Sequence, residues 1–226
     1  MEFHPFNRNI MKKFLLTFAF AAAVMTAGAQ VKELEPENSY TIPDYAQFLK
    51  NKQAAAEECD GCPEDGEGDN AQDCFPVTNI KATSRLAPQG NNNYDEKNLY
   101  DYNYYTPWVE GTKGYGIGEK ITFTLEDVNA GFTGIYITNG YPKSKTAWQN
   151  NSRVKKLKLS YDGTPMYILN LKDEMSEQIF NWEKALNIDG DELVRTFTVT
   201  LEILDVYKGD KYDDTAISEI TFGGCY

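Results

Sequence analysis

The stretch Arg195–Tyr207, RTFTVTLEILDVY, decides the fold class of this chain. Its apolar side chains Phe197, Val199, Leu201 and Ile203 alternate with threonine and glutamate. Such period-two alternation puts one face of an extended strand in a core and leaves the other face in water. The stretch therefore predicts a long, half-buried β-strand.

Shorter runs with the same alternation occur on both sides of it. Four are KITFTLE (residues 120–126), GIYITNG (134–140), KKLKLSYDG (155–163) and AISEITF (216–222). Turn-forming residues bound them, among them Asn139-Gly140, Asp162-Gly163 and Lys208-Gly209-Asp210. Only MSEQIFNWEKAL, which begins at Met175, has a briefly helical pattern. Residues 75–226 are thus predicted to form one all-β sandwich around a shared core.

The residues before the sandwich predict a leader and a polar connection. Met11-Lys12-Lys13, the apolar run after it and Ala27-Gly28-Ala29 are typical of a bacterial secretory signal spanning residues 1–29. We therefore expect a secreted or periplasmic protein whose mature chain starts at about Gln30. Residues 30–74 are expected to hold an irregular start, a short helix opening at Thr41-Ile42-Pro43, and an acidic linker.

Composition narrows the classes of function. The formal net charge is −12, which disfavours nucleic acid and anionic membranes as partners. The apolar run of the leader is too short to span a membrane, so no membrane insertion is expected. The one histidine, His4, lies in the predicted leader. Its removal would exclude histidine general bases, serine or cysteine triads and HExxH zinc sites, but would leave carboxylate chemistry open.

Four cysteines, Cys59, Cys62, Cys74 and Cys225, suggest disulfides in an exported chain. Three connectivities are open, and we favour a small local loop between Cys59 and Cys62 with a clasp between Cys74 and Cys225. A redox or zinc role for the CxxC spacing lacks a thioredoxin-like βαβ pattern and a second pair of ligands.

The glycines of TPWVEGTKGYGIGE (residues 106–119) do not form a nucleotide-binding loop. Gly114, Gly116 and Gly118 have GxGxG spacing, and the strand pattern KITFTLE follows. A dinucleotide fingerprint needs GxGxxG followed by a helix, whose N-terminus faces the pyrophosphate. These glycines are interpreted instead as a flexible approach to a strand.

An ordered series of motifs resembles a known family. The series runs from YDEKNLYDYNYYTPWVEGTKGYGIGEKITFTL at Tyr94 through ITNGY and NNSRVKKLKLSYDG to VYKGDKYDDTAISEITF. It resembles the NADase-type glycan-binding domain, one of the discoidin-like (coagulation factor 5/8 type C) jelly rolls. The resemblance covers about residues 75–226. It implies a discoidin-like jelly-roll β-sandwich that binds a cell-surface or polysaccharide glycan without catalysis.

Sugars offer an apolar C–H face and a rim of hydroxyls, so their sites combine aromatic platforms with amides, carboxylates or guanidinium groups. The loop NGYPKSKTAWQNNSR is one source of such residues, and two further groups are Trp108 with Glu110 and Tyr212 with Asp213 and Asp214. The predicted sugar-binding residues are Trp108, Glu110, Asn139, Tyr141, Trp148, Asn151, Arg153, Tyr212, Asp213 and Asp214, with Asn150 beside them.

Two of these residues have an alternative structural interpretation. Trp108 is equally suited to the core and Arg153 to pairing with an acidic neighbour, while Trp182, which is not among them, is expected to pack against the sandwich. The resemblance also implies a structural calcium, held by Asp101, Thr106 and Glu219; oxygen ligands suit calcium. Ordinary turn capping by Asp101 and Thr106 is the alternative.

Two other functions compete with glycan binding. One is a glycoside hydrolase that acts through two loop carboxylates such as Glu110 and Asp213, which would have to face each other across a cleft. The other is an adhesion module that binds protein through the same loops.

Overall fold

The computed structural model describes residues 31–42, 75–127, 131–186 and 195–223. The predicted leader, the body of the predicted helix, the acidic linker and all four cysteines lie outside these residues. The elements are β1 (Lys32–Leu34), β2 (Asn38–Thr41), β3 (Val77–Ala82), the 3-10 helix η1 (Glu96–Tyr100), β4 (Trp108–Val109), β5 (Lys120–Asp127), β6 (Phe132–Asn139), α2 (Lys145–Asn150), β7 (Ser152–Tyr161), β8 (Thr164–Asn170), β9 (Ser176–Leu186), β10 (Arg195–Tyr207) and β11 (Thr215–Gly223).

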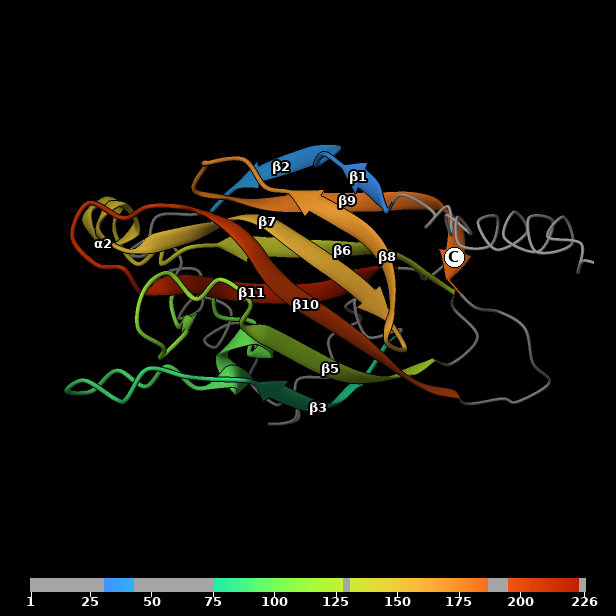
Figure 1. Cartoon of the computed structure of the whole chain (residues 1–226), viewed down its shortest axis with the longest axis horizontal. Helices are drawn as coiled ribbons and strands as arrows, with labels where there is room; N and C mark the ends of the chain where they lie inside the picture. Colours follow the sequence, from blue (N-terminus) through green and yellow to red (C-terminus); the bar gives the residue numbers. More distant parts are fainter. Residues whose placement is uncertain (1–30, 43–74, 128–130, 187–194, 224–226) are drawn as a thin grey trace, which may run out of the picture. The chain divides into compact units, whose positions relative to one another are not determined.

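The described strands form one curled, mixed sheet in the order β2-β9-β6-β11-β7-β10-β5-β3, with β8 beside β7 and β4 beside β11 (Figure 1). Most neighbours are antiparallel. A short parallel pairing between the start of β11 and the start of β7 joins the two halves, through Thr215 with Ser152 and Ala216 with Arg153. This curled sheet confirms the predicted all-β jelly-roll sandwich.

The two halves of the sheet pack face to face through the predicted alternating residues. In β10, the side chains of Phe197, Val199, Leu201 and Ile203 are at most 1% exposed, as the sequence predicted. Aromatic rings join the halves, since Phe123 of β5 meets Phe222 of β11 edge-on at 5.1 Å between centroids. Burying these large rings, together with the aliphatic side chains around them, stabilises the fold.

Residues 176–186 form strand β9, so the helical interpretation of MSEQIFNWEKAL was wrong. Gln178, Phe180 and Trp182 alternate along β9 and are all buried. The predicted packing role of Trp182 is confirmed. Its ring lies edge-on to Phe132 at 4.7 Å, and its indole N–H donates to the Phe132 carbonyl at 2.9 Å.

The expected irregular start of the chain instead contains two strands that belong to the sheet. β1 pairs in parallel with β8, and β2 pairs with β9 in antiparallel register. Glu33 of β1 accepts hydrogen bonds from Lys156 and Asn170, which lie on β7 and β8. Residues 32–41 are polar because they cover edge strands at the surface, where little apolar burial is available.

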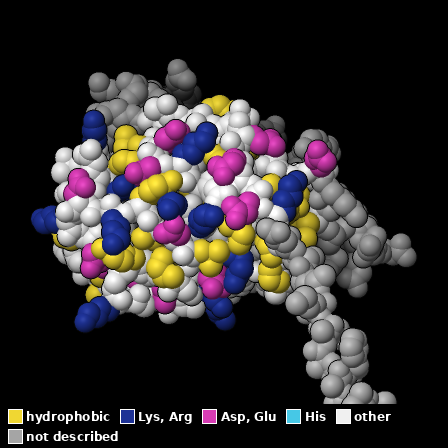
Figure 2. Space-filling model, turned by 45° about the horizontal axis from the view of Figure 1, so that its top comes forward, with side chains coloured by type: hydrophobic (Ala, Val, Ile, Leu, Met, Phe, Trp, Pro, Cys, Tyr) yellow, Lys and Arg dark blue, Asp and Glu magenta, His cyan; other side chains and the backbone are white. Residues whose placement is uncertain are grey.

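Charges of both signs are interspersed over the face drawn in Figure 2. Ion pairs also join neighbouring strands, among them Lys158 with Glu202 and Lys155 with Asp205. That face therefore presents no broad basic area of the kind that attracts nucleic acid. In the described part of the chain, no helix has the length and hydropathy needed to cross a membrane.

Candidate functional site

A short helix between β6 and β7 builds one wall of the candidate site. Ser144 caps its N-terminus, because the Ser144 hydroxyl accepts a hydrogen bond from the Ala147 N–H at 3.0 Å. Asn151 caps the C-terminus of the helix, and its side-chain amide donates to the Ala147 carbonyl at 2.8 Å. Six helical residues are too few to be stable alone. The position of α2 therefore depends on contacts from the rest of the sandwich.

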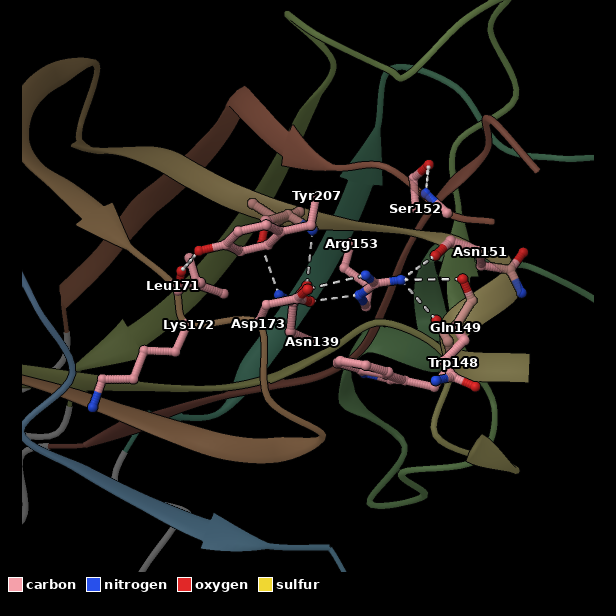
Figure 3. Close-up of polar contacts among 12 residues, drawn as sticks. Asn139, Trp148, Gln149, Asn151, Ser152, Arg153, Leu171, Lys172, Asp173 and Tyr207 are labelled. Atoms are coloured by element: carbon pink, nitrogen blue, oxygen red, sulfur yellow. Dashed lines mark hydrogen bonds and ion pairs between the residues drawn. The ribbon is translucent and has the colours of Figure 1, made fainter. Parts of the chain in front are cut away.

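Arg153 of β7 supplies the main contact that holds α2 (Figure 3). Its guanidinium donates to the main-chain carbonyls of Trp148 at 2.9 Å and Asn151 at 2.7 Å, and forms a two-pronged ion pair with Asp173. The guanidinium also lies over the Trp148 ring, 4.2 Å from its centroid. Arg153 is 6% exposed, so its guanidinium is shielded from water, whereas the Asp173 side chain is 40% exposed. Arg153 therefore anchors the helix and is not available to a ligand.

The loop between β10 and β11 is fixed against the same helix. The Asn150 carbonyl accepts hydrogen bonds from the Lys211 and Tyr212 N–H groups, at 3.2 and 2.8 Å. Gly209 permits this approach, because a Cβ there would lie 2.4 Å from the Asn150 carbonyl oxygen. The Asp214 carbonyl in turn accepts from the Ser152 N–H at 3.0 Å. Tyr212 and Asp214 are thereby held beside α2.

These loops enclose a cavity of about 360 Å³ at the end of the sandwich where α2 lies (Figure 1). Tyrosines and apolar side chains form part of its wall, and amides, hydroxyls and one carboxylate form the rest. The lining residues are Leu86, Gln89, Tyr94, Val109, Tyr141, Ser144, Thr146, Ala147, Asn150, Asn151, Tyr212 and Asp214. The volume lies within the range of small-molecule sites, roughly 300–1,000 Å³.

Four of the ten predicted sugar-binding residues line this cavity: Tyr141, Asn151, Tyr212 and Asp214. Asn150, named beside them, lines it too. Tyr212 is 41% exposed, and the Lys211 ammonium lies over its ring, 4.9 Å from the centroid. These residues lie far apart in the sequence, in the loops around α2 and before β11, and the fold brings them together. Whether they bind sugar stays a prediction.

The other six predicted residues do not line the cavity. Trp108 is fully buried in the core, where its indole N–H donates to the Ser84 carbonyl at 3.0 Å. Asn139 is also fully buried and joins two strands, because its side chain bonds both the N–H and the carbonyl of Val154. We therefore withdraw Trp108 and Asn139 as ligand contacts. The alternative core role of Trp108 and the alternative pairing role of Arg153 both match the structure.

Trp148 and Asp213 lie next to cavity residues but outside the lining. The half-buried Trp148 indole packs between Arg153 and Gly140, where an added Cβ would lie 2.9 Å from the ring. Its N–H is buried and has no hydrogen-bond partner among the described residues. Asp213 is exposed to solvent. Trp148 thus supports the helix and is not an open platform.

Glu110 is a buried structural carboxylate. One oxygen accepts from the N–H and hydroxyl of Thr112, each at 2.8 Å, and the other from the Thr215 N–H at 3.3 Å. Burial raises the pKa of Glu110, and the neighbouring Asp214 charge adds to this rise. The hydrogen bonds from Thr112 and Thr215 act in the opposite direction and lower the pKa. Gly116 has a φ of 67° and lies directly against Glu110. Gly116 therefore lets the loop fold closely over this carboxylate, and the Tyr115 carbonyl accepts a hydrogen bond from the Thr215 hydroxyl at the start of β11 at 2.9 Å.

The sequence missed Leu86, Gln89, Tyr94, Ser144, Thr146, Val109 and Ala147 as lining residues. Leu86, Val109 and Tyr94 pack together with Ala216 and Tyr141 in a small apolar cluster beneath the cavity. The stretch PQGNNN before Tyr94 is rich in turn-forming residues, which is the local signal for this loop. No sequence signal placed that loop at the same end of the sandwich as α2.

The three predicted calcium ligands meet around one turn. The Thr106 hydroxyl donates to Asp101 at 2.7 Å, and the Asn103 N–H donates to both Asp101 and Glu219, at 3.0 and 3.2 Å. The turn capping by Asp101 and Thr106 is therefore present. Tyr102 between them has a φ of 55°, a left-handed conformation that glycine usually adopts.

Glu219 is nearly fully buried in this turn. Burial, followed by repulsion from Asp101, raises the pKa of Glu219 to about 9. One of its oxygens has no hydrogen-bond partner among the described residues. A buried, unpartnered carboxylate oxygen beside Asp101 and Thr106 fits a hard cation such as calcium. The described residues hold no cluster of three or more His, Cys, Asp or Glu side chains suited to a metal ion.

The fold and the cavity define a β-sandwich module with a loop-built pocket at one end. Residues 72–223, well over half of the chain, match the family model of the NAD glycohydrolase translocation F5/8 type C domain. The chain belongs to this family. Comparison with curated proteins finds no match.

Solved structures with similar folds include carbohydrate-binding modules of the CBM32 class. CpGH89CBM32-5 from Clostridium perfringens, solved with GalNAc-β-1,3-galactose, has 17% identity and a TM-score of 0.45, covering 67% of this chain and 96% of that one. The CBM32-1 and CBM32-2 domains of C. perfringens ZmpB have 10% identity and a TM-score of 0.47, covering 84% of this chain and 41% of that one. The arabinofuranosyltransferase AftD from Mycobacteria has 17% identity and a TM-score of 0.46 over 66% of this chain, which spans 11% of AftD.

Proposed function

We propose that this protein is a non-catalytic glycan-binding module whose site is the cavity beside α2. The observation that carries the proposal is the composition of the cavity wall. Tyr94, Tyr141 and Tyr212 line it together with the amides of Gln89 and Asn150. Tyrosine rings accept the C–H face of a sugar, while amides and hydroxyls pair with its hydroxyls.

The way the wall is held supports a preformed site. Tyr212 is fixed through its main chain to Asn150, and α2 is fixed by Arg153. A preformed site loses little conformational entropy on binding, which favours weak ligands such as single sugars. Each hydroxyl bond adds only about 1 kcal/mol net, so we expect weak binding to a single sugar unit.

The two carboxylates named for the competing hydrolase hypothesis, Glu110 and Asp213, do not support it. Glu110 is fully buried with both oxygens accepting hydrogen bonds, and Asp213 lies outside the cavity lining. A general acid or nucleophile must reach the scissile bond. We therefore propose binding without hydrolysis, and a glycan-release assay on the same ligands tests that part.

The test of the site compares two exposed tyrosines by NMR titration with a glycan panel that includes GalNAc-β-1,3-galactose. Tyr212→Ala removes a lining ring, and Tyr40→Ala removes a ring of β2 that is 59% exposed and outside the lining. We expect Tyr212→Ala to weaken binding by roughly 3- to 10-fold, the range for one aromatic contact. Equal effects of the two substitutions, or no titration by any glycan, would contradict the proposal.

We also propose that the protein acts outside the cytoplasm, on a cell-surface or polysaccharide glycan. The signal pattern of residues 1–29 supports export. The test is N-terminal sequencing of protein recovered from periplasm and medium after expression in a bacterium. A mature chain beginning near Gln30 is expected, and an uncleaved chain retained in the cytoplasm would contradict export.

A structural calcium held by Asp101, Thr106 and Glu219 is a further part of the proposal. When bound, the ion would neutralise the buried carboxylate and tie the turn before β4 to β11. Calcium should then raise the midpoint of thermal unfolding. Glu219→Gln should abolish that rise, and the same calcium response in wild type and variant would contradict the assignment.

A further inference from the structure

The cavity lining carries charge of one sign. Among the twelve lining residues, all of which lie in the described part of the chain, Asp214 is the one with a formal charge at neutral pH. No lysine or arginine is among these described lining residues, although the Lys211 ammonium lies over the ring of the lining residue Tyr212. A ligand that enters the cavity therefore meets Asp214 as the charged group of its lining.

Asp214 is half-buried, and it forms none of the ion pairs present among the described residues. Burial raises the pKa of Asp214, and the negative charge of the neighbouring Asp213 raises it further. Lys211 is the nearest cation in the sequence, but its ammonium lies over the Tyr212 ring, 4.9 Å from the centroid. Lys143 and Lys145 are exposed at the start of α2 and do not line the cavity.

The tyrosines of the wall favour the same sign of ligand charge. Tyr94, Tyr141 and Tyr212 all line the cavity together with Asp214. Burial raises the pKa of Tyr94; a side-chain hydrogen bond with Asn92 opposes this rise, and the Asp214 charge adds to it. Tyrosine ring faces are electron-rich and attract ammonium groups. A carboxylate among such rings is suited to a cation and repels an anion.

We propose that the cavity selects sugars that carry a free amino group and excludes acidic sugars. The inference rests on the proposed glycan-binding function and specifies the class of sugar. A protonated amine would bind at Asp214, next to the faces of Tyr94 and Tyr212. Acetylation of the amine removes the charge, and a uronic acid places a second carboxylate in the cavity.

The experiment measures dissociation constants by NMR for three matched methyl glycosides: a galactosaminide, an N-acetylgalactosaminide and a galacturonide. The corresponding three derivatives of glucose are measured too, so that the result does not depend on whether the cavity accepts the galactose or the glucose ring. Near neutral pH we expect the free amine to bind about 10-fold more tightly than the N-acetyl form, as a charged hydrogen bond provides. The acidic form should bind weakest.

Two neighbouring substitutions separate the local effect from the overall charge. Asp214→Asn removes the lining carboxylate and should reduce the amine preference to within about 3-fold, while Asp213→Asn makes the same charge change outside the lining and should leave it nearly intact. Thermal melts check that both variants are folded. The charge selection alone is overturned if sugars bind but the amine is not preferred over the N-acetyl and acidic forms. It is also overturned if that order of affinities is unchanged in Asp214→Asn. Failure of every sugar in both series overturns the glycan function and the selection with it.

Discussion

Replacing Arg153 with methionine should destabilise the whole domain, because this side chain ties α2 to the sandwich. The substitution keeps most of the apolar stem but removes the guanidinium. Its two shortest carbonyl contacts, to Trp148 at 2.9 Å and Asn151 at 2.7 Å, are lost. At roughly 1.5 kcal/mol for each hydrogen bond to a charged group, their loss costs about 3 kcal/mol. The Asp173 side chain, 40% exposed, can regain water, so the broken ion pair adds little.

Urea denaturation followed by tryptophan fluorescence measures this loss, and a thermal melt should show a decrease of roughly 6–12 °C. Lys155→Met is the matched control on the same strand. Its ammonium pairs with Asp205 where both side chains are over 40% exposed, so no measurable change is expected. Equal stabilities of the two variants would refute the anchoring role of Arg153. Loss of stability without any loss of glycan binding would refute its role in positioning the cavity wall.

Three further predictions concern the loop, the surface and the core. Gly116→Ala should lower the unfolding free energy more than Gly114→Ala does. Both residues have positive φ, but only at Gly116 would the new methyl group clash, 2.6 Å from the buried Glu110 side chain. Chemical denaturation compares the two variants, and equal losses of stability would contradict the close packing. A hydrogen bond from Lys158 lowers the pKa of Glu202, so ionised Glu202 stabilises the fold at neutral pH and loses that contribution as the pH falls through its pKa. Wild type should therefore be more stable than Glu202→Gln by about 0.5 kcal/mol after solvent screening at neutral pH. This difference in unfolding free energy should vanish in acid, and a difference that grows in acid would contradict the prediction. Phe132→Ala should cost roughly 4 kcal/mol in the same denaturation assay, because its ring contacts aromatic rings from both halves of the sandwich, and a cost under about 1 kcal/mol would contradict that packing.

The strands that alternate strictly were predictable from the sequence, and β10 is the clearest case. Its four apolar positions are all buried as expected. β9 was mistaken for a helix because Ile179 and Trp182 have helical spacing, and the strand became evident only through its pairing with β6. β1 and β2 were missed because polar edge strands have no apolar alternation, so only their partners identify them.

Polar and aromatic residue types alone did not distinguish ligand contacts from structural ones. Trp108 and Asn139 have the chemistry of a sugar site, yet both are fully buried. Arg153 has it too, but its hydrogen bonds are made to the protein's own carbonyls. Conversely, Tyr94 and Gln89 line the cavity although their loop lies far in sequence from the predicted one.

The sequence by itself determined the fold class, the acidic character and two of the loops that carry the site, since these follow from alternation, composition and turn residues without any long-range contact. Only the tertiary structure decided which side chains face the cavity. That outcome depends on how α2 is anchored by Arg153 and on the pairing of β11 with β7, which brings Asp214 beside Asn150. Such contacts join residues distant in the chain. Their geometry is therefore set by the packing of the whole sandwich.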